Sequence, residues 1–199
     1  MSHYYSEEQD VVSNPVHFTY TYETHELKLK TDSGVFSKGS IDFGSNVLVR
    51  AFLQEDRRYS KILDVGCGYG PIGLMIASVY TDSAVHMVDV NARALSLAEE
   101  NASKNHIDNV NIYKSDALSQ VEETFDAILT NPPIRAGKEV VNQILDQSYE
   151  RLEDAGALYV VIQKKQGMPS AKKRMEGLFG NVEVLTKDKG YYILKSVKG

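Results

Sequence analysis

Two short segments carry the residue types that a ligand-binding and catalytic site needs. The first is Asp64-Val65-Gly66-Cys67-Gly68-Tyr69-Gly70, which begins within an apolar run at 62–65. Glycines at this spacing allow a tight turn whose backbone can approach a ligand closely. The second is Asn131-Pro132-Pro133, which follows an apolar run at 125–130. Its amide and carbonyl oxygens can each accept an N–H, and the prolines stiffen the loop, so the segment suits the positioning of an amine.

Three aspartates follow three successive apolar runs. Asp64, Asp89 and Asp116 each stand at or just after the end of a predicted strand. A single aspartate in such a place is as often a turn former or a helix cap as a ligand-binding group. Open α/β sheets, however, bind their ligands at the carboxyl ends of the strands. Three acids at that edge therefore favour a binding site.

The elements that must position these residues alternate along the chain. Residues 16–31 have the polar-apolar alternation of a β-hairpin with a turn near Thr24-His25, and Asp42 is placed to cap a helix. Helices are predicted at 71–80, at 92–104 after a cap at Asn91, over an apolar face from Val140 to Leu152, and at 169–178. Strands are predicted at 62–65, 85–89, 110–113, 125–130, 157–162, 182–185 and 191–197. This alternation predicts an α/β fold with a mostly parallel sheet covered on both faces and an antiparallel terminal pair.

Composition sets the class of protein. The 199 residues are 42% hydrophobic and 25% charged, and we expect one domain, with an extension and hairpin at 1–40 and a Rossmann-like core at 41–199. The chain has no apolar run long enough for a membrane span, no signal-peptide pattern and one cysteine, Cys67, which together favour the cytoplasm. The five histidines show no metal-ligand spacing, so we expect no metal.

Charge is unevenly distributed. Residues 161–199 hold nine Lys or Arg and three Asp or Glu, a net charge of +6. Because the whole chain has a net charge of −5, residues 1–160 have a net charge of −11. A basic C-terminal segment could meet phosphate groups, although solubilising surface lysines explain it equally well.

The glycine loop has two interpretations. Gly68, Gly70 and Gly73 satisfy a dinucleotide-binding fingerprint, with Asp89 about 20 residues further on. Yet Asp64 before the glycines resembles motif I of the class I methyltransferases. S-adenosylmethionine is cationic and would be attracted by Asp64, whereas a pyrophosphate would be repelled. The resemblance implies that this cofactor is bound by Asp64, Gly66, Cys67, Gly68, Gly70, Asp89, Val90, Asp116, Ala117 and Asn131.

A second resemblance covers residues from about 17 to the end. The segments 34–37, 42–45 and 131–138, together with the glycine loop, are similar to the short relatives of bacterial 16S ribosomal RNA guanine-N2 methyltransferases, the small-subunit methyltransferase C-like enzymes of the MTS family. The resemblance implies a seven-stranded sheet with one reversed strand. It also implies a guanine N2 amine as the acceptor, in ribosomal RNA or a small-subunit assembly intermediate, and Asn131, Pro132 and Pro133 as the catalytic residues.

The substrate side departs from the pattern at one position. Many Asn-Pro-Pro enzymes have an aromatic residue next, to stack on the target ring, whereas this chain has Ile134. Phe36 is a candidate for that role, and a core aromatic is an equal alternative for it. Arg135 and Lys138 flank the loop and could hold an RNA phosphate, as could the more distant basic residues Lys164, Lys165, Lys172, Lys173 and Arg174.

Three other functions stay open at this point. A protein-glutamine methyltransferase would use the same Asn-Pro-Pro loop. A nicotinamide-dependent oxidoreductase would use the glycine loop but would need neither Asp64 nor Asn131. A non-catalytic cofactor-binding module would have no reason to keep the Asn-Pro-Pro segment. The sequence does not indicate the oligomeric state.

Overall fold

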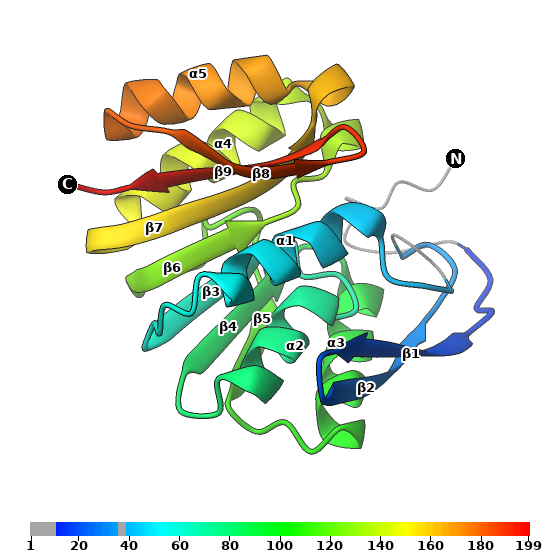
Figure 1. Ribbon diagram of the computed structural model, residues 1–199. Coiled ribbons are helices and arrows are strands. Elements are labelled where there is room, and N and C mark those ends of the chain that lie inside the picture. Colours follow the sequence, from blue (N-terminus) through cyan, green and yellow to red (C-terminus); the bar gives the residue numbers. More distant parts are fainter. Residues whose placement is uncertain (1–10, 36–38) are drawn as a thin grey trace.

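The computed structural model describes residues 11–35 and 39–199 as a seven-stranded sheet with helices on both faces and a separate two-stranded hairpin (Figure 1). The hairpin strands are β1 (Val16–Tyr22) and β2 (His25–Thr31). The sheet is built from β3 (Lys61–Val65), β4 (Ala84–Asp89), β5 (Val110–Lys114), β6 (Phe125–Thr130), β7 (Leu152–Gln163), β8 (Glu183–Asp188) and β9 (Tyr191–Val197). The helices are α1 (Phe43–Gln54), α2 (Pro71–Val79), α3 (Ala92–Lys104), α4 (Lys138–Glu150) and α5 (Met168–Phe179), with short 3-10 turns η1 (Ile134–Ala136) and η2 (Lys164–Gln166).

The sheet is mostly parallel with one reversed strand, as the sequence predicted. Its strand order is β5-β4-β3-β6-β7-β9-β8, and β9 is the one strand of this sheet that runs opposite to the other six. The reversed strand lies one position in from the edge, because the turn at Lys189-Gly190 returns the chain between β7 and β8. The edge strand β8 is therefore the more exposed of the last two.

Two hydrophobic cores lie on the two faces of the sheet. In β7 the side chains alternate between them: Ala157, Tyr159 and Val161 face the core formed with α1, α2 and α3, whereas Leu158, Val160 and Ile162 face the core formed with α4 and α5. Both sets are buried, so the strand is apolar without interruption, as expected for a central strand covered on both sides. In the described part of the chain, no helix has the length and apolar character of a membrane span.

One predicted boundary is wrong. The apolar face that begins at Val140 continues by spacing to Leu152, but α4 ends at Glu150 and Leu152 is the first residue of β7. Leu152 pairs with Phe125, and an irregularity follows before Ala157 pairs with Ala127. Leu152 still packs in the α4–α5 core, so the helical spacing reported its burial correctly and its backbone conformation incorrectly.

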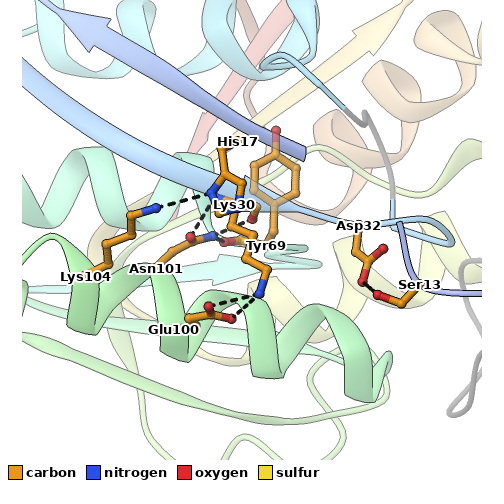
Figure 2. Close-up of polar contacts among 8 residues, drawn as sticks. All are labelled: Ser13, His17, Lys30, Asp32, Tyr69, Glu100, Asn101 and Lys104. Carbon is orange, nitrogen blue, oxygen red and sulfur yellow. Dashed lines mark hydrogen bonds and ion pairs between the residues drawn. The ribbon is translucent and has the colours of Figure 1, made fainter. Parts of the chain in front are cut away.

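The N-terminal hairpin covers α2 and α3 on the outer side of the molecule (Figure 1). Its inward side chains Tyr20, Tyr22, Leu27 and Leu29 are buried in the core of that face. Polar contacts at its periphery include the Lys30–Glu100 ion pair, the contact between Lys104 and His17, and the Ser13–Asp32 hydrogen bond (Figure 2).

Asn101 on α3 and Asn105, the C-cap of that helix, pair with the edge of β2 as a neighbouring strand would. Asn101 accepts from the Lys30 N–H at 2.8 Å and donates to the Lys30 carbonyl at 2.9 Å, and Asn105 makes the same pair of bonds to Lys28 at 2.9 Å each. Asn101 also donates to the Tyr69 carbonyl at 2.9 Å (Figure 2). Because Tyr69 belongs to the glycine loop, this fully buried amide connects the hairpin to that loop.

We predict that Asn101→Ala lowers the free energy of unfolding by about 1–3 kcal/mol, because it removes the partner of the buried Tyr69 carbonyl and of the partly buried backbone groups of Lys30. Urea denaturation measures the loss. Asn105→Ala is the matched control, since it removes the bonds to Lys28 in a more exposed setting and its effect should be smaller. Equal losses in the two variants would contradict the role given to burial.

Candidate active site

The candidate site lies where the central strands β3 and β6 end side by side. Val65 pairs with Thr130, and the Thr130 hydroxyl donates to the Val65 carbonyl at 3.0 Å. The strands that follow β3 in sequence are added first on one side of it, as β4 and β5, and then on the other, beginning with β6. The position between β3 and β6 is therefore the switch point at which open α/β sheets bind ligands. Gly66 and Asn131 follow directly, so the two segments with catalytic potential meet here.

The glycine loop is shaped by backbone conformations that favour glycine. Gly66 has φ +72°, and a Cβ built there would meet nothing within 4 Å, so this residue borders open space. Gly70 has φ +104°, and a Cβ there would lie 2.7 Å from Leu74. The loop therefore needs glycine at 66 for its turn and at 70 for both its turn and the packing beneath it. The Gly66 and Cys67 N–H groups both donate to the Val88 carbonyl at 2.9 Å.

Asp64 lies beneath the glycine loop and is completely buried. Its Oδ2 accepts from the Gly73 N–H at 3.0 Å, whereas its buried Oδ1 has no hydrogen-bond partner among the described residues. Burial, with a smaller contribution from the charge of Asp89, raises the pKa of Asp64 to about 7, against the opposing effect of the Gly73 hydrogen bond. A carboxyl group in this state favours a nearby cation.

Asp89 ties the glycine loop to the next helix. Its carboxylate accepts from the Gly68 N–H and from the Asn91 N–H, both at 2.9 Å. Asn91 in turn caps α3 by accepting from the Ala94 N–H at 3.0 Å, as predicted. Asp89 is thus held firmly at the edge of the sheet where the parallel strands end, which we call the strand-end edge.

The third aspartate of the predicted set is placed differently. Asp116 is exposed after β5, and its N–H donates to the Gln120 side chain at 2.6 Å. Ala117 beside it is buried with φ +48°. The Ser115 N–H donates to the Asp89 carbonyl at 3.1 Å, so the ends of β4 and β5 are linked along the same edge.

The Asn-Pro-Pro loop is held against the N-terminus of α1. The Asn131 Nδ2 atom donates to the Asp42 carboxylate at 2.8 Å and to the Ser45 hydroxyl at 3.0 Å. Pro132 is buried, and Pro133 precedes η1, which carries Ile134 and the exposed Arg135.

One cavity of about 400 Å³ joins the two loops. The predicted residues that line it are Gly66, Cys67, Asn131, Pro132, Pro133, Ile134 and Arg135. The lining residues absent from the predicted site include Asp42, Ser45, Tyr69, Gln163, Gln166 and Tyr191. Tyr191 comes from the far end of the chain because the reversed strand β9 begins beside the end of β7, where Gln163 pairs with Tyr191.

The remaining predicted residues lie around this cavity. Lys138 lines a smaller neighbouring cavity of about 130 Å³ that shares Ile134 with the first. Phe36 lies outside the described residues. The residues that do not line the cavity belong to the strand-end edge and the glycine loop: Asp64, Gly68, Gly70, Asp89, Val90, Asp116 and Ala117.

The thiol and the phenols that line the cavity are not activated as nucleophiles, because the pKa of each is raised. Burial, and then the charge of Asp89, raises the pKa of the Cys67 thiol, which keeps it protonated. Burial also raises the pKa of the Tyr69 and Tyr191 phenols, with a further contribution from Asp42 in each case. In the described part of the chain, no cluster of three His, Cys, Asp or Glu residues could hold a metal ion.

These observations fit S-adenosylmethionine as the cofactor. Asp64 offers an unpartnered, buried carboxyl oxygen beneath a loop that is open at Gly66, which suits a cationic ligand and not a pyrophosphate. The cavity volume is within the range of small-molecule sites.

The sheet and the two loops together define the class. A mostly parallel seven-stranded sheet with one reversed strand carries an acidic glycine loop and an Asn-Pro-Pro loop at one edge, and this is a class I S-adenosylmethionine-dependent methyltransferase. The family model described as "Methyltransferase small domain" matches residues 26–195, so the chain belongs to that family. Its membership excludes the nicotinamide-dependent oxidoreductase considered above.

The similar proteins include one of matching length and several that are about twice as long. The chain is 52% identical over 198 residues to a Bacillus subtilis (strain 168) protein described as "Uncharacterized protein YbxB", and 98% of each is covered. It is 33% identical over 176 residues to ribosomal RNA small subunit methyltransferase C of Hahella chejuensis, which covers 86% of this chain and 50% of the relative. The chain spans about half the length of the curated ribosomal RNA methyltransferases it matches.

One solved structure, of a protein about twice as long, has the same fold as this chain. The Thermus thermophilus 16S rRNA N2 G1207 methyltransferase (RsmC), in complex with AdoMet and guanosine, superposes with a TM-score of 0.82 at 25% identity. The match covers 93% of this chain and 51% of that one.

We predict that S-adenosylmethionine binding releases a proton between about pH 5 and 7. The pKa of Asp64 in the folded protein without cofactor is about 7, so the group is largely protonated in this range, and a bound cation favours its ionised form. Affinity should therefore rise with pH up to about pH 7 and level off above it. Calorimetry in buffers of different ionisation enthalpy measures the proton count.

Asp64→Asn provides the control for this prediction, because it keeps the shape of the side chain and removes the titrating group. The variant should bind more weakly above pH 7 and release no proton. A wild-type protein that binds the cofactor with no proton release near pH 6 would contradict the placement of its positive charge near Asp64.

Proposed function

We propose that this protein transfers a methyl group from S-adenosylmethionine to the exocyclic N2 amine of a guanine in ribosomal RNA. The observation that carries the proposal is the single cavity bordered both by Gly66 and Cys67 of the glycine loop and by Asn131 and Pro132 of the Asn-Pro-Pro loop. Donor and acceptor of the methyl group can meet only if their two loops face one space.

In this proposal the strand-end edge holds the cofactor. Gly66 and Cys67 would contact it directly, Asp64 would favour its positive charge, Asp89 would accept the ribose hydroxyls, and Asp116 with Ala117 would border the adenine. When bound, S-adenosylmethionine supplies an electrophilic methyl carbon attached to a sulfonium.

The Asn-Pro-Pro loop positions the amine. A guanine NH₂ is a poor nucleophile because its lone pair is delocalised into the ring. The Asn131 side-chain oxygen and the Pro132 carbonyl can each accept one of its N–H groups and so direct the lone pair toward the methyl carbon. Pro133 has no N–H that could compete for these acceptors. The amine becomes acidic only as it gains the methyl group, and the proton can then leave to water, so no strong base is needed.

The target ring needs a surface to lie against, and Tyr191 supplies an aromatic one. Tyr191 lines the same cavity as Asn131, and its ring packs against Phe43, with ring centroids 5.4 Å apart. We therefore assign to Tyr191 the stacking role that Ile134 cannot fill. Gln163 and Gln166 in the same wall offer polar groups to the edge of the base.

Ribosomal RNA is favoured as the substrate by the relatives and by the basic residues near the cavity. The similar small-subunit methyltransferase C and large-subunit methyltransferase G proteins both bear names that specify ribosomal RNA. Arg135 lines the cavity. Lys138 is exposed at the start of α4, and Lys164 and Lys165 are exposed on η2. Arg174 is less suited to hold a phosphate, because it forms a two-bond ion pair with Asp146.

We predict that Asn131→Ala binds S-adenosylmethionine with little change and loses methyl transfer by about 100-fold or more, because the aligning acceptor is removed. The readout is tritiated methyl transfer to purified ribosomal subunits and RNA, followed by mass mapping of the modified nucleoside. Methylated guanine at N2 supports the proposal. Methylated glutamine in a ribosomal protein, or unchanged transfer by the variant, would contradict it.

We predict that the double substitution Arg135→Glu and Lys138→Glu weakens RNA binding at low salt and lowers the slope of log affinity against log salt by about 1.5, which corresponds to two lost phosphate contacts. The matched control is Lys28→Glu with Lys104→Glu, the same charge change on β2 of the hairpin and at the end of α3, where neither residue lines the cavity. A slope that falls equally in the control would mean that both pairs act only through net charge.

A further inference from the structure

The segment Asp42-Phe43-Gly44-Ser45 is more than the start of a helix. Asp42 caps α1, because its Oδ2 accepts from the Ser45 N–H at 3.0 Å and from the Ser45 hydroxyl at 3.3 Å. A cap needs only these local bonds. Yet both polar side chains also bond the Asn131 amide, 89 positions from Asp42 along the chain.

We infer that Asp42 and Ser45 are positioning residues for methyl transfer, which fix the Asn131 carboxamide so that its oxygen faces the target amine. The inference rests on the proposed function in one respect, the use of Asn131 as an acceptor. It adds a second segment of the chain, at the N-terminus of α1, to the catalytic apparatus.

The orientation of the amide follows from the chemistry of Asp42. A carboxamide can turn by 180° with almost no change in shape, so packing alone does not choose which end faces the cavity. An ionised carboxylate only accepts hydrogen bonds. A reversed Asn131 would bring its oxygen to the Asp42 carboxylate oxygen, to the position where Nδ2 now lies at 2.8 Å, and the two acceptors would repel. Asp42 therefore selects one of the two orientations.

The selected orientation is the one that the reaction needs. Asp42 and Ser45 take both hydrogens of Nδ2, which leaves Oδ1 as the remaining polar atom of the side chain. The target amine offers only N–H donors, so a reversed amide would oppose it. As the amine gains positive charge during transfer, its N–H groups become stronger donors. The carboxylate behind the amide polarises Oδ1 and strengthens that bond further.

Phe43 and Gly44, the two middle residues of the segment, pack against the wall of the same cavity. The Phe43 ring packs against Tyr191, the aromatic residue of the cavity wall. Gly44 is buried, and a Cβ built there would lie 2.8 Å from the Tyr191 ring and 3.2 Å from the Asp42 carboxylate. A side chain at 44 would therefore displace either the wall or the residue that orients Asn131, whereas a helix cap alone does not require glycine at this position.

The test compares Asp42→Asn with the wild-type protein. Asparagine keeps the size of the side chain and is an equally good helix cap, so α1 should stay intact. It is no longer restricted to accepting and carries no charge, so it does not force the orientation of Asn131. We expect kcat for methyl transfer to fall on the order of tenfold, with KM for S-adenosylmethionine and the melting temperature unchanged. Ser45→Ala should give a smaller fall, because it removes one of the two acceptors.

A double-mutant cycle separates positioning from a general structural role. In an Asn131→Ala background, Asp42→Asn should cause no further loss, because the group through which it acts is already absent. An additive loss would overturn the inference. Asp146→Asn on α4 makes the same chemical change outside the site, in the ion pair with Arg174, and serves as the control.

An NMR measurement tests the orientation without any transfer reaction. The side-chain NH₂ signals of Asn131 are identified by their absence in Asn131→Ala. In the wild-type protein both hydrogens should exchange slowly with water, and Asp42→Asn should speed up that exchange. Unchanged exchange would overturn the inference, and so would full kcat of Asp42→Asn in a protein that transfers methyl groups. A wild-type protein that methylates no guanine in ribosomal RNA would instead refute only the proposed function, because the NMR result stands apart from it.

Discussion

The whole site depends on the parallel pairing of β3 with β6 at the centre of the sheet. Val65 and Thr130 are partners in that pairing, and the Thr130 hydroxyl fixes their relative height by donating to the Val65 carbonyl. Parallel strands must end at the same edge, so the loop that follows each strand begins within a few ångströms of the other. This is the physical reason why a glycine turn and an Asn-Pro-Pro turn, about 65 residues apart in the chain, border one cavity.

A carboxyl group lies beside each of the two loops, and the two groups act in different ways. Beneath the glycine loop, Asp64 is desolvated and keeps an unpartnered oxygen, which destabilises its charged form until a cation is nearby. Beside the Asn-Pro-Pro loop, Asp42 and Ser45 accept both hydrogen bonds from the Asn131 Nδ2 group and so hold the amide in one orientation. Asp64 therefore favours the binding of a cationic ligand. Asn131, the group that would receive the substrate, loses conformational freedom.

Much of the fold could be predicted because its signals are local. Apolar runs identified the seven strands of the sheet, and Asp42 and Asn91 occupy the cap positions predicted for them. The error at Leu152 arose because burial and helical spacing coincide there, while the pairing with Phe125 that makes it a strand residue is not local. The roles of Asp42, Ser45 and Tyr191 in lining the cavity were missed for the same reason, since their partners lie far away in the chain.

The sequence by itself determined the order of strands and helices, the glycine turn and the stiff Asn-Pro-Pro turn, because backbone preferences and side-chain burial act over a few residues. Only the tertiary structure decided which of the chemically able side chains share one cavity. It placed Tyr191 at the strand-end edge through the reversal of β9, and it turned a helix cap toward Asn131. Such contacts depend on the packing of distant elements, and no short stretch of residues contains that information.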